Sequence, residues 1–192
     1  MDKGGRIFCL LLCCSLVTEC ASFILAILKG TNTIVYHIYS PVEFFLVSLY
    51  FNTTINTFRK KNIGIYIGVI GVIVSILNTV FFQTLQNFNT YYLLFEGLCF
   101  ISMSLFSFYQ IMLKDNYISP LKDPHFRISF LLLFFWCVTF IAWGVYEMMN
   151  TPDRSQVIGL ILWIANIILY SGSGIVFLLY RKQPKPVPSE YA

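Results

Sequence analysis

Six apolar stretches, each long enough to cross a lipid bilayer as a helix, occupy most of this chain of 192 residues. About 20 apolar residues span the hydrocarbon core of a bilayer as an α-helix. Charged residues make up only 11% of the chain, against about 25% in a typical soluble domain. The sequence therefore predicts an all-α fold, a polytopic membrane protein built as a six-transmembrane-helix bundle. We place the spans at 7–28, 35–57, 63–85, 90–113, 126–149 and 157–180.

The basic residues predict how this bundle is oriented. Of the 13 Lys and Arg residues, all but Lys29 and Arg154 fall before the first span or after the second, fourth and sixth spans. Lys and Arg concentrate in cytoplasmic loops, so we expect both the N and C termini to be cytoplasmic. We expect one helical domain over 1–180, a disordered cytoplasmic tail over 181–192, and a bacterial inner membrane as the location. The net charge of +4 reflects this asymmetry and does not indicate a nucleic-acid partner.

Three glutamates, Glu19, Glu43 and Glu96, lie inside predicted spans with no Lys or Arg at comparable depth. A charged side chain near the bilayer centre costs about 2.5–3.5 kcal/mol, so such groups usually face a bundle interior or a ligand site. Tyr39 precedes Glu43 by four residues and Tyr92 precedes Glu96 by four, which places each pair on one helix face. These acids therefore indicate a functional site in the outer half of the membrane.

Other polar and indole groups have the same predicted depth. Aromatic walls combined with carboxylates suit a cationic or amphipathic ligand. The predicted ligand-binding residues are Glu43, Glu96, Glu19, Tyr39, Tyr92, His37, Asn78, Trp143 and Asn166. Structural alternatives stay open: Trp143 could belong to an interfacial aromatic belt, the asparagines could bond across helices, and the acids could form a protonated pair bonded to Tyr39 and Tyr92.

A stripe of small residues marks the third span. Gly64, Gly68, Gly71 and Ser75, followed by Asn78, recur at intervals of three and four residues and therefore share one helix face. Small residues let another helix approach closely. We expect the stripe to pack against another helix of the same chain, with a second copy of the chain or a membrane partner as the alternative.

The sequence holds no recognisable catalytic motif. It contains neither H-E-x-x-H nor G-x-x-x-x-G-K-[ST], and its six cysteines lie within predicted spans without zinc-ligand spacing. Its two histidines, His37 and His125, both lie at span ends. We therefore expect no catalytic residue, no metal and no cofactor, and we favour a protein that is not an enzyme.

Two segments carry a resemblance to known proteins. His37-Ile-Tyr-Ser-Pro-Val-Glu-Phe-Phe45, followed by Asn89-Thr-Tyr-Tyr-Leu-Leu-Phe-Glu96, resembles a pattern of small multi-pass bacterial membrane proteins of unassigned function. This resemblance implies a self-contained membrane family and transfers no site residue.

Three functional hypotheses follow. The leading one is a pocket that binds or transports a cationic or lipid-like small molecule, or senses it for a membrane partner. The second is an enzyme acting on lipid or polyprenyl substrates, with Glu43 or Glu96 as general acid or base beside His37. The third is a structural subunit in which the small-residue stripe docks a partner or a second copy. Membrane lipids are expected contacts in each case.

Overall fold

The structure is a computed structural model that describes residues 1–113, 120–148 and 152–180, the side chains of 152–155 and 180 excepted. It confirms the predicted all-α class and the six apolar spans, because six of its helices are long and apolar enough to cross a membrane. The predicted tail over 181–192 lies outside the described residues. The long helices are α1 (Lys3–Lys29), α2 (Thr33–Thr54), α4 (Ile63–Phe81), α5 (Thr90–Met112), α6 (Pro124–Met148) and α7 (Pro152–Tyr180), and the short ones are α3 (Asn56–Lys61) and the 3-10 helix η1 (Pro120–Lys122).

Local signals set the ends of α1. The Asp2 carboxylate accepts a hydrogen bond of 2.8 Å from the backbone N–H of Gly5 and caps the first turn. At the other end Gly30 adopts a φ of 71°, a left-handed conformation that glycine tolerates and that ends the helix. The first span is thus slightly longer at both ends than the hydropathy pattern predicts.

The third span is shorter than predicted, since α4 ends at Phe81 and not near residue 85. The carbonyl of Asn78 accepts hydrogen bonds from the backbone N–H groups of both Phe82 and Gln83, at 3.0 and 2.8 Å. The Gln83 side chain then donates to the Thr90 hydroxyl at 2.7 Å, which turns the chain toward α5. Polar side chains therefore end this helix before its apolar run is complete.

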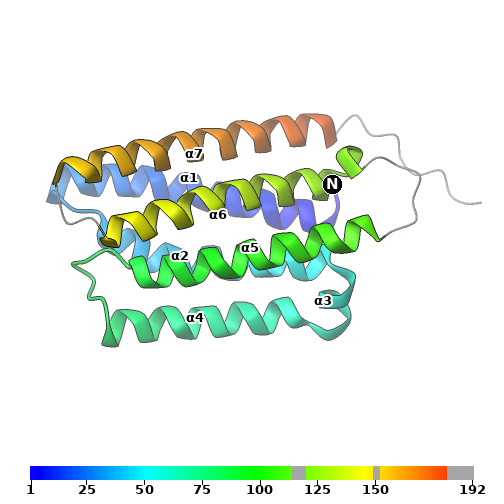
Figure 1. Cartoon of the computed structure of the whole chain (residues 1–192), viewed down its shortest axis with the longest axis horizontal. Coiled ribbons are helices and arrows are strands. Elements are labelled where there is room, and N and C mark those ends of the chain that lie inside the picture. Colours follow the sequence, from blue (N-terminus) through cyan, green and yellow to red (C-terminus); the bar gives the residue numbers. More distant parts are fainter. Residues whose placement is uncertain (114–119, 149–151, 181–192) are drawn as a thin grey trace, which may run out of the picture.

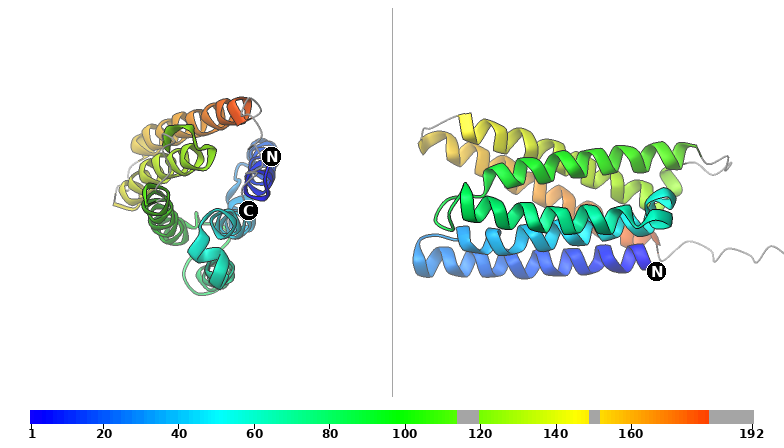
Figure 2. Two further views of the ribbon diagram at one scale, coloured as in Figure 1. Left: turned by 90° about the vertical axis from the view of Figure 1, so that its right-hand side faces the viewer. Right: turned by 90° about the horizontal axis from the view of Figure 1, so that it is seen from below.

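The six long helices run side by side (Figure 1), and the N-terminus and the C-terminal end of α7 lie at the same end of the bundle. Seen along the bundle, α1, α2, α5, α6 and α7 surround a common axis, and α4 lies outside this ring (Figure 2). The most extensive contacts join α1 with α2, α2 with α4, α5 with α6, and α6 with α7. The outward surfaces are largely apolar, as a lipid-facing bundle requires.

The small-residue stripe of α4 lies against α2. A Cβ atom added at Gly68 would lie 2.8 Å from Cδ2 of Phe45, and one added at Gly71 would collide with the ring of Phe44. Gly64, Ser75 and Asn78 are buried as well. A partner could reach this stripe only by displacing α2, so the stripe is not a free docking surface.

Buried rings pack in the half of the bundle that carries the N-terminus and the C-terminal end of α7. Phe8 of α1 contacts Tyr50 of α2 with ring centroids 5.6 Å apart. At mid-height, Phe100 of α5 lies 5.1 Å from Phe44 and 4.8 Å from Trp136 of α6. This layer of rings separates the packed half of the bundle from the half in which a cavity is found.

Candidate ligand-binding cavity

A cavity of about 510 Å³ lies inside the ring of helices, in the half away from the termini. It is lined by residues of α1, α2, α5, α6 and α7, by Asn32 before α2 and by Phe88 of the connection between α4 and α5, whereas α4 contributes none. The polar lining residues are Ser15, Glu19, Asn32, Tyr36, Tyr39, Ser40, Glu43, Thr139, Tyr146 and Asn166, and the others are Phe88, Leu93, Phe135, Trp136, Trp143, Ile158, Gly159, Leu162, Trp163 and Leu169.

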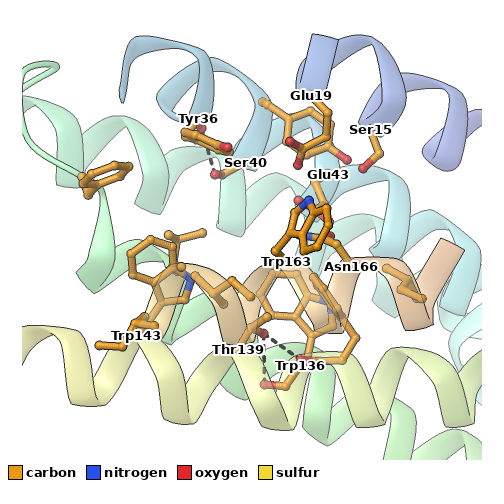
Figure 3. A pocket seen from close by; sticks show the side chains of 18 of the residues that line it. Ser15, Glu19, Tyr36, Ser40, Glu43, Trp136, Thr139, Trp143, Trp163 and Asn166 are labelled. Carbon is orange, nitrogen blue, oxygen red and sulfur yellow. Dashed lines mark hydrogen bonds between the residues drawn. The ribbon is translucent and has the colours of Figure 1, made fainter. Parts of the chain in front are cut away.

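Two carboxyl groups from different helices face this cavity. In Figure 3 the Glu19 side chain points from α1 toward Glu43 of α2, and the two groups are close enough to interact electrostatically. Neither carboxyl has a hydrogen bond or an ion pair within the described part of the chain, where the one salt bridge joins His125 and Asp2. The cavity therefore presents two acidic groups that the described residues do not neutralise.

Three tryptophans supply aromatic walls. Trp136 is almost fully buried and packs edge-on against Phe135, with ring centroids 5.4 Å apart, so its orientation is fixed. Trp163 on α7 is 64% exposed, so most of its indole surface is accessible. Trp143 lies nearer the end of the bundle and contacts Phe88, with centroids 5.8 Å apart. Indole faces attract cations through the ring quadrupole.

Hydrogen bonds fix the positions of polar side chains on the side of the cavity that α1 and α2 form. The Ser22 hydroxyl donates to the Tyr36 hydroxyl at 3.2 Å and accepts from the Asn32 amide at 2.6 Å. The Ser40 hydroxyl donates to the Tyr36 carbonyl and accepts from the Asn89 amide. The Tyr39 hydroxyl, by contrast, is buried and has no partner among the described residues.

Five of the nine predicted ligand-binding residues line the cavity. These are Glu19, Glu43, Tyr39, Trp143 and Asn166. Glu96 and Tyr92 are buried beside it and do not reach its surface. His37 faces α4 from α2, and Asn78 belongs to α4, which contributes no residue to the cavity.

The surroundings of His37 and Asn78 explain why the cavity does not include them. One ring nitrogen of His37, Nδ1, lies 3.0 Å from the Thr79 hydroxyl of α4, and Nε2 lies 2.9 Å from the Asn87 carbonyl. Asn78 donates to the Gln83 side chain at 3.3 Å. Both side chains take part in the contact of α4 with α2 and in the connection that follows, so the structure does not bring them together with the cavity residues.

Glu96 has an unusual environment. Its side chain is fully buried, and neither carboxyl oxygen has a hydrogen-bond partner among the described residues. The Tyr92 hydroxyl, one turn away on α5, is also buried without a partner. Glu96 and Glu43 are close enough to interact electrostatically, so a buried acid lies near an acid that lines the cavity. The alternative in which the acids bond to Tyr39 and Tyr92 has no support here, because both tyrosine hydroxyls are buried without a partner among the described residues.

The cavity also contains residues that the sequence reasoning did not include. Tyr36 and Ser40 precede Glu43 by seven and three residues, and Ser15 precedes Glu19 by four, so helical spacing from the two acids would have found them. Phe88 lies outside any helix, and no periodic pattern could have identified it.

A second, more polar cavity of about 560 Å³ lies at the end of the bundle away from the termini. Glu147 lines it and accepts a hydrogen bond from the Thr90 hydroxyl, to which Gln83 in turn donates. Phe88 and Tyr146 line both cavities and pack edge-on with ring centroids 6.2 Å apart. An aromatic contact therefore separates a polar outer cavity from the acidic inner one.

Metal binding has no geometric basis in the part of the chain that the structure describes. No three side chains of His, Cys, Asp or Glu gather there in a way that could hold an ion. Comparison of the chain with protein-family models, with curated proteins and with solved structures finds no match. Function is therefore inferred from the residues of the cavity alone.

Proposed function

We propose that this integral membrane protein binds a cationic, amphipathic small molecule in its inner cavity. The observation that carries the proposal is the pair Glu19 and Glu43, which face one aromatic-walled cavity without a cationic partner among the described residues. Burying a carboxylate without a counter-charge is costly. A bound cation would supply that counter-charge.

The lining supports a ligand with an apolar, aromatic-binding part. Three tryptophans and several aliphatic side chains surround the two acids. Ligand pockets typically combine such walls with a few polar groups that set orientation. A cation over an indole face gains about 0.5–2 kcal/mol, more where water is excluded. A small hydrated ion would leave these walls unused, so an organic cation fits better.

The proposed orientation gives the ligand an extracytoplasmic approach. The positive-inside rule favours cytoplasmic termini, and we propose a bacterial inner membrane as the location. Both cavities lie in the half of the bundle away from the N-terminus. The ligand would enter the outer cavity and pass the Phe88–Tyr146 contact. Binding would then serve either transport or the sensing of the ligand for a membrane partner.

The geometry favours this function over the two alternatives. A lipid-acting enzyme that pairs Glu43 with His37 would need both at the cavity, but both His37 ring nitrogens already have partners on the α4 side. A subunit that docks through the α4 stripe would need that stripe free, but α2 covers it.

Binding of tetraphenylphosphonium to the purified protein in lipid nanodiscs tests the proposal. We expect saturable binding by isothermal titration calorimetry, and no binding of triphenylphosphine oxide, which has similar rings and no net charge. Glu43→Gln and Glu19→Gln should each weaken binding at least tenfold, about 1.4 kcal/mol. Glu190→Gln makes the same chemical change in the C-terminal segment and should have no effect. Equal binding of the neutral compound, or unchanged affinity in both cavity variants, would refute the proposal.

A further inference from the structure

Three carboxyl groups form a row that leads from the cavity into the bundle. Glu19 of α1 and Glu43 of α2 interact electrostatically, and Glu43 interacts in the same way with Glu96 of α5. The first two line the cavity, whereas Glu96 is fully buried and both its oxygens lack hydrogen-bond partners among the described residues. The row thus joins a ligand-accessible acid to one that is enclosed by protein.

Among the described residues, none with a positive charge lies near Glu96 to balance an ionised carboxylate. The titratable groups that face it are Tyr92 and Cys99 of its own helix and Glu43 and Tyr39 of α2. Toward α6, the adjoining Gly97 meets the rings of Phe140 and Trp136. Toward α4, the buried Ser75 lies near Tyr92, one turn before Glu96.

Neighbouring carboxylates in a low-dielectric interior oppose one another's ionisation, so such a pair retains a proton. A cation beside Glu43 stabilises the ionised form of its carboxyl group and so weakens the binding of the proton. A cationic ligand can therefore replace the proton that the two carboxyl groups hold.

We propose that Glu43 and Glu96 form a proton-binding pair, and that a cation entering the cavity displaces one proton from it. This inference rests on the proposed function, since it needs a cationic ligand in the cavity. A carboxyl O–H bond breaks, its electron pair stays on the oxygen, and the proton leaves through the cavity to the solvent. The ligand cation takes over the neutralising role, so binding exchanges one positive charge for another.

Proton release can be measured together with binding. Titration of tetraphenylphosphonium into the full-length protein in nanodiscs, repeated in buffers of different ionisation enthalpy at one pH, gives the number of protons released per ligand bound. We expect wild-type protein to release a measurable fraction of one proton, up to one. Glu96→Gln should still bind the cation, because both cavity acids remain, and its proton release should fall by at least half.

Two further variants make the test decisive. Glu96→Leu removes the same titratable group with an apolar side chain, and serves if the Gln variant is unstable; Glu190→Gln should release as many protons as wild type. Binding without proton release, or equal release in the Glu96 variants, would overturn the exchange and leave the proposed function intact. No binding of the cation by wild type would overturn both.

Discussion

Ser15 of α1 and Tyr170 of α7 share a hydrogen bond of 2.6 Å between their hydroxyl groups. These two helices come together beside the cavity, and each also contacts another neighbour, α2 for α1 and α6 for α7. A second contact joins them nearer the termini, where the rings of Phe8 and Phe177 lie 6.0 Å apart. The hydrogen bond between these hydroxyl groups therefore joins α1 to α7 beside the cavity and completes the ring of helices.

Removing this link should loosen the join of α1 and α7. Tyr170→Phe deletes one hydroxyl and should lower the free energy of unfolding by about 0.5–1.5 kcal/mol. A double-mutant cycle with Ser15→Ala, read by thermal unfolding in a fixed detergent, isolates the pair. We expect the double variant to be less destabilised than the two single changes added together, and full additivity would show that the hydroxyls do not interact.

The contact of α4 with α2 depends on the absence of side chains at the stripe. Gly71→Ala would place a Cβ atom in collision with the ring of Phe44 and should destabilise the fold by about 1–3 kcal/mol. Gly174→Ala on α7 is the matched control, because a Cβ there meets nothing within 4 Å. It should leave stability unchanged or raise it by about 0.5–1 kcal/mol. Equal thermal shifts in the two variants would contradict the packing.

The network around Gln83 should stabilise the connection between α4 and α5. Gln83 donates to Thr90 and accepts from the Asn78 amide and from the Tyr91 backbone N–H. Gln83→Ala leaves several buried polar groups without partners and should cost about 1–3 kcal/mol. Gln86→Ala, at an exposed position of the same connection, should change the unfolding temperature little. Proteolysis of the connection gives an independent readout.

The fold was largely predictable because lipid imposes strict requirements on sequence. Only closed hydrogen-bonding structures cross a bilayer, so six apolar stretches of about 20 residues imply six helices. The position of α4 outside the ring was not predictable. A glycine stripe shows that a helix packs closely, but not that its neighbour is the helix carrying Phe44 and Phe45.

The cavity was predictable only in part because depth and helix face are different properties. His37 and Glu43 both lie on α2 and in the same half of the membrane, so depth alone predicted that they share a site. The face of α2 that carries His37, Phe44 and Ser48 points toward α4. The face that carries Tyr36, Ser40 and Glu43 points toward the cavity. The two sets follow helical spacing, but only the placement of α4 shows which set faces inward. Unpaired acids were the better guide, since Glu19 and Glu43 both line the cavity.

The wall formed by Trp163 should contribute directly to binding of tetraphenylphosphonium. Its indole is largely accessible, and it lines the cavity from α7. Trp163→Ala should weaken binding by about 0.5–2 kcal/mol, and Trp163→Phe by less, since a smaller ring retains part of the cation–π attraction. Tyr66→Ala removes an exposed ring of α4, outside the cavity, and should leave affinity unchanged. If the Ala and Phe variants bind as tightly as wild type, the indole is not a contact.

The ring of Phe88 should control how fast a ligand reaches the inner cavity. Phe88 lines both cavities and contacts Tyr36, Trp143 and Tyr146, with centroid separations of 6.4, 5.8 and 6.2 Å. Phe88→Ala removes the ring that the two cavities share and leaves Glu19 and Glu43 in place. We expect tetraphenylphosphonium to bind and dissociate faster in stopped-flow experiments, with a smaller change in the dissociation constant, because a barrier to access affects both rates alike.

Phe82→Ala is the control. Phe82 lies on the same connection but lines only the outer cavity, so the rates of this variant should stay close to those of wild type. Unchanged rates in Phe88→Ala would show that the ligand reaches the acids by another path, such as the join between α1 and α7.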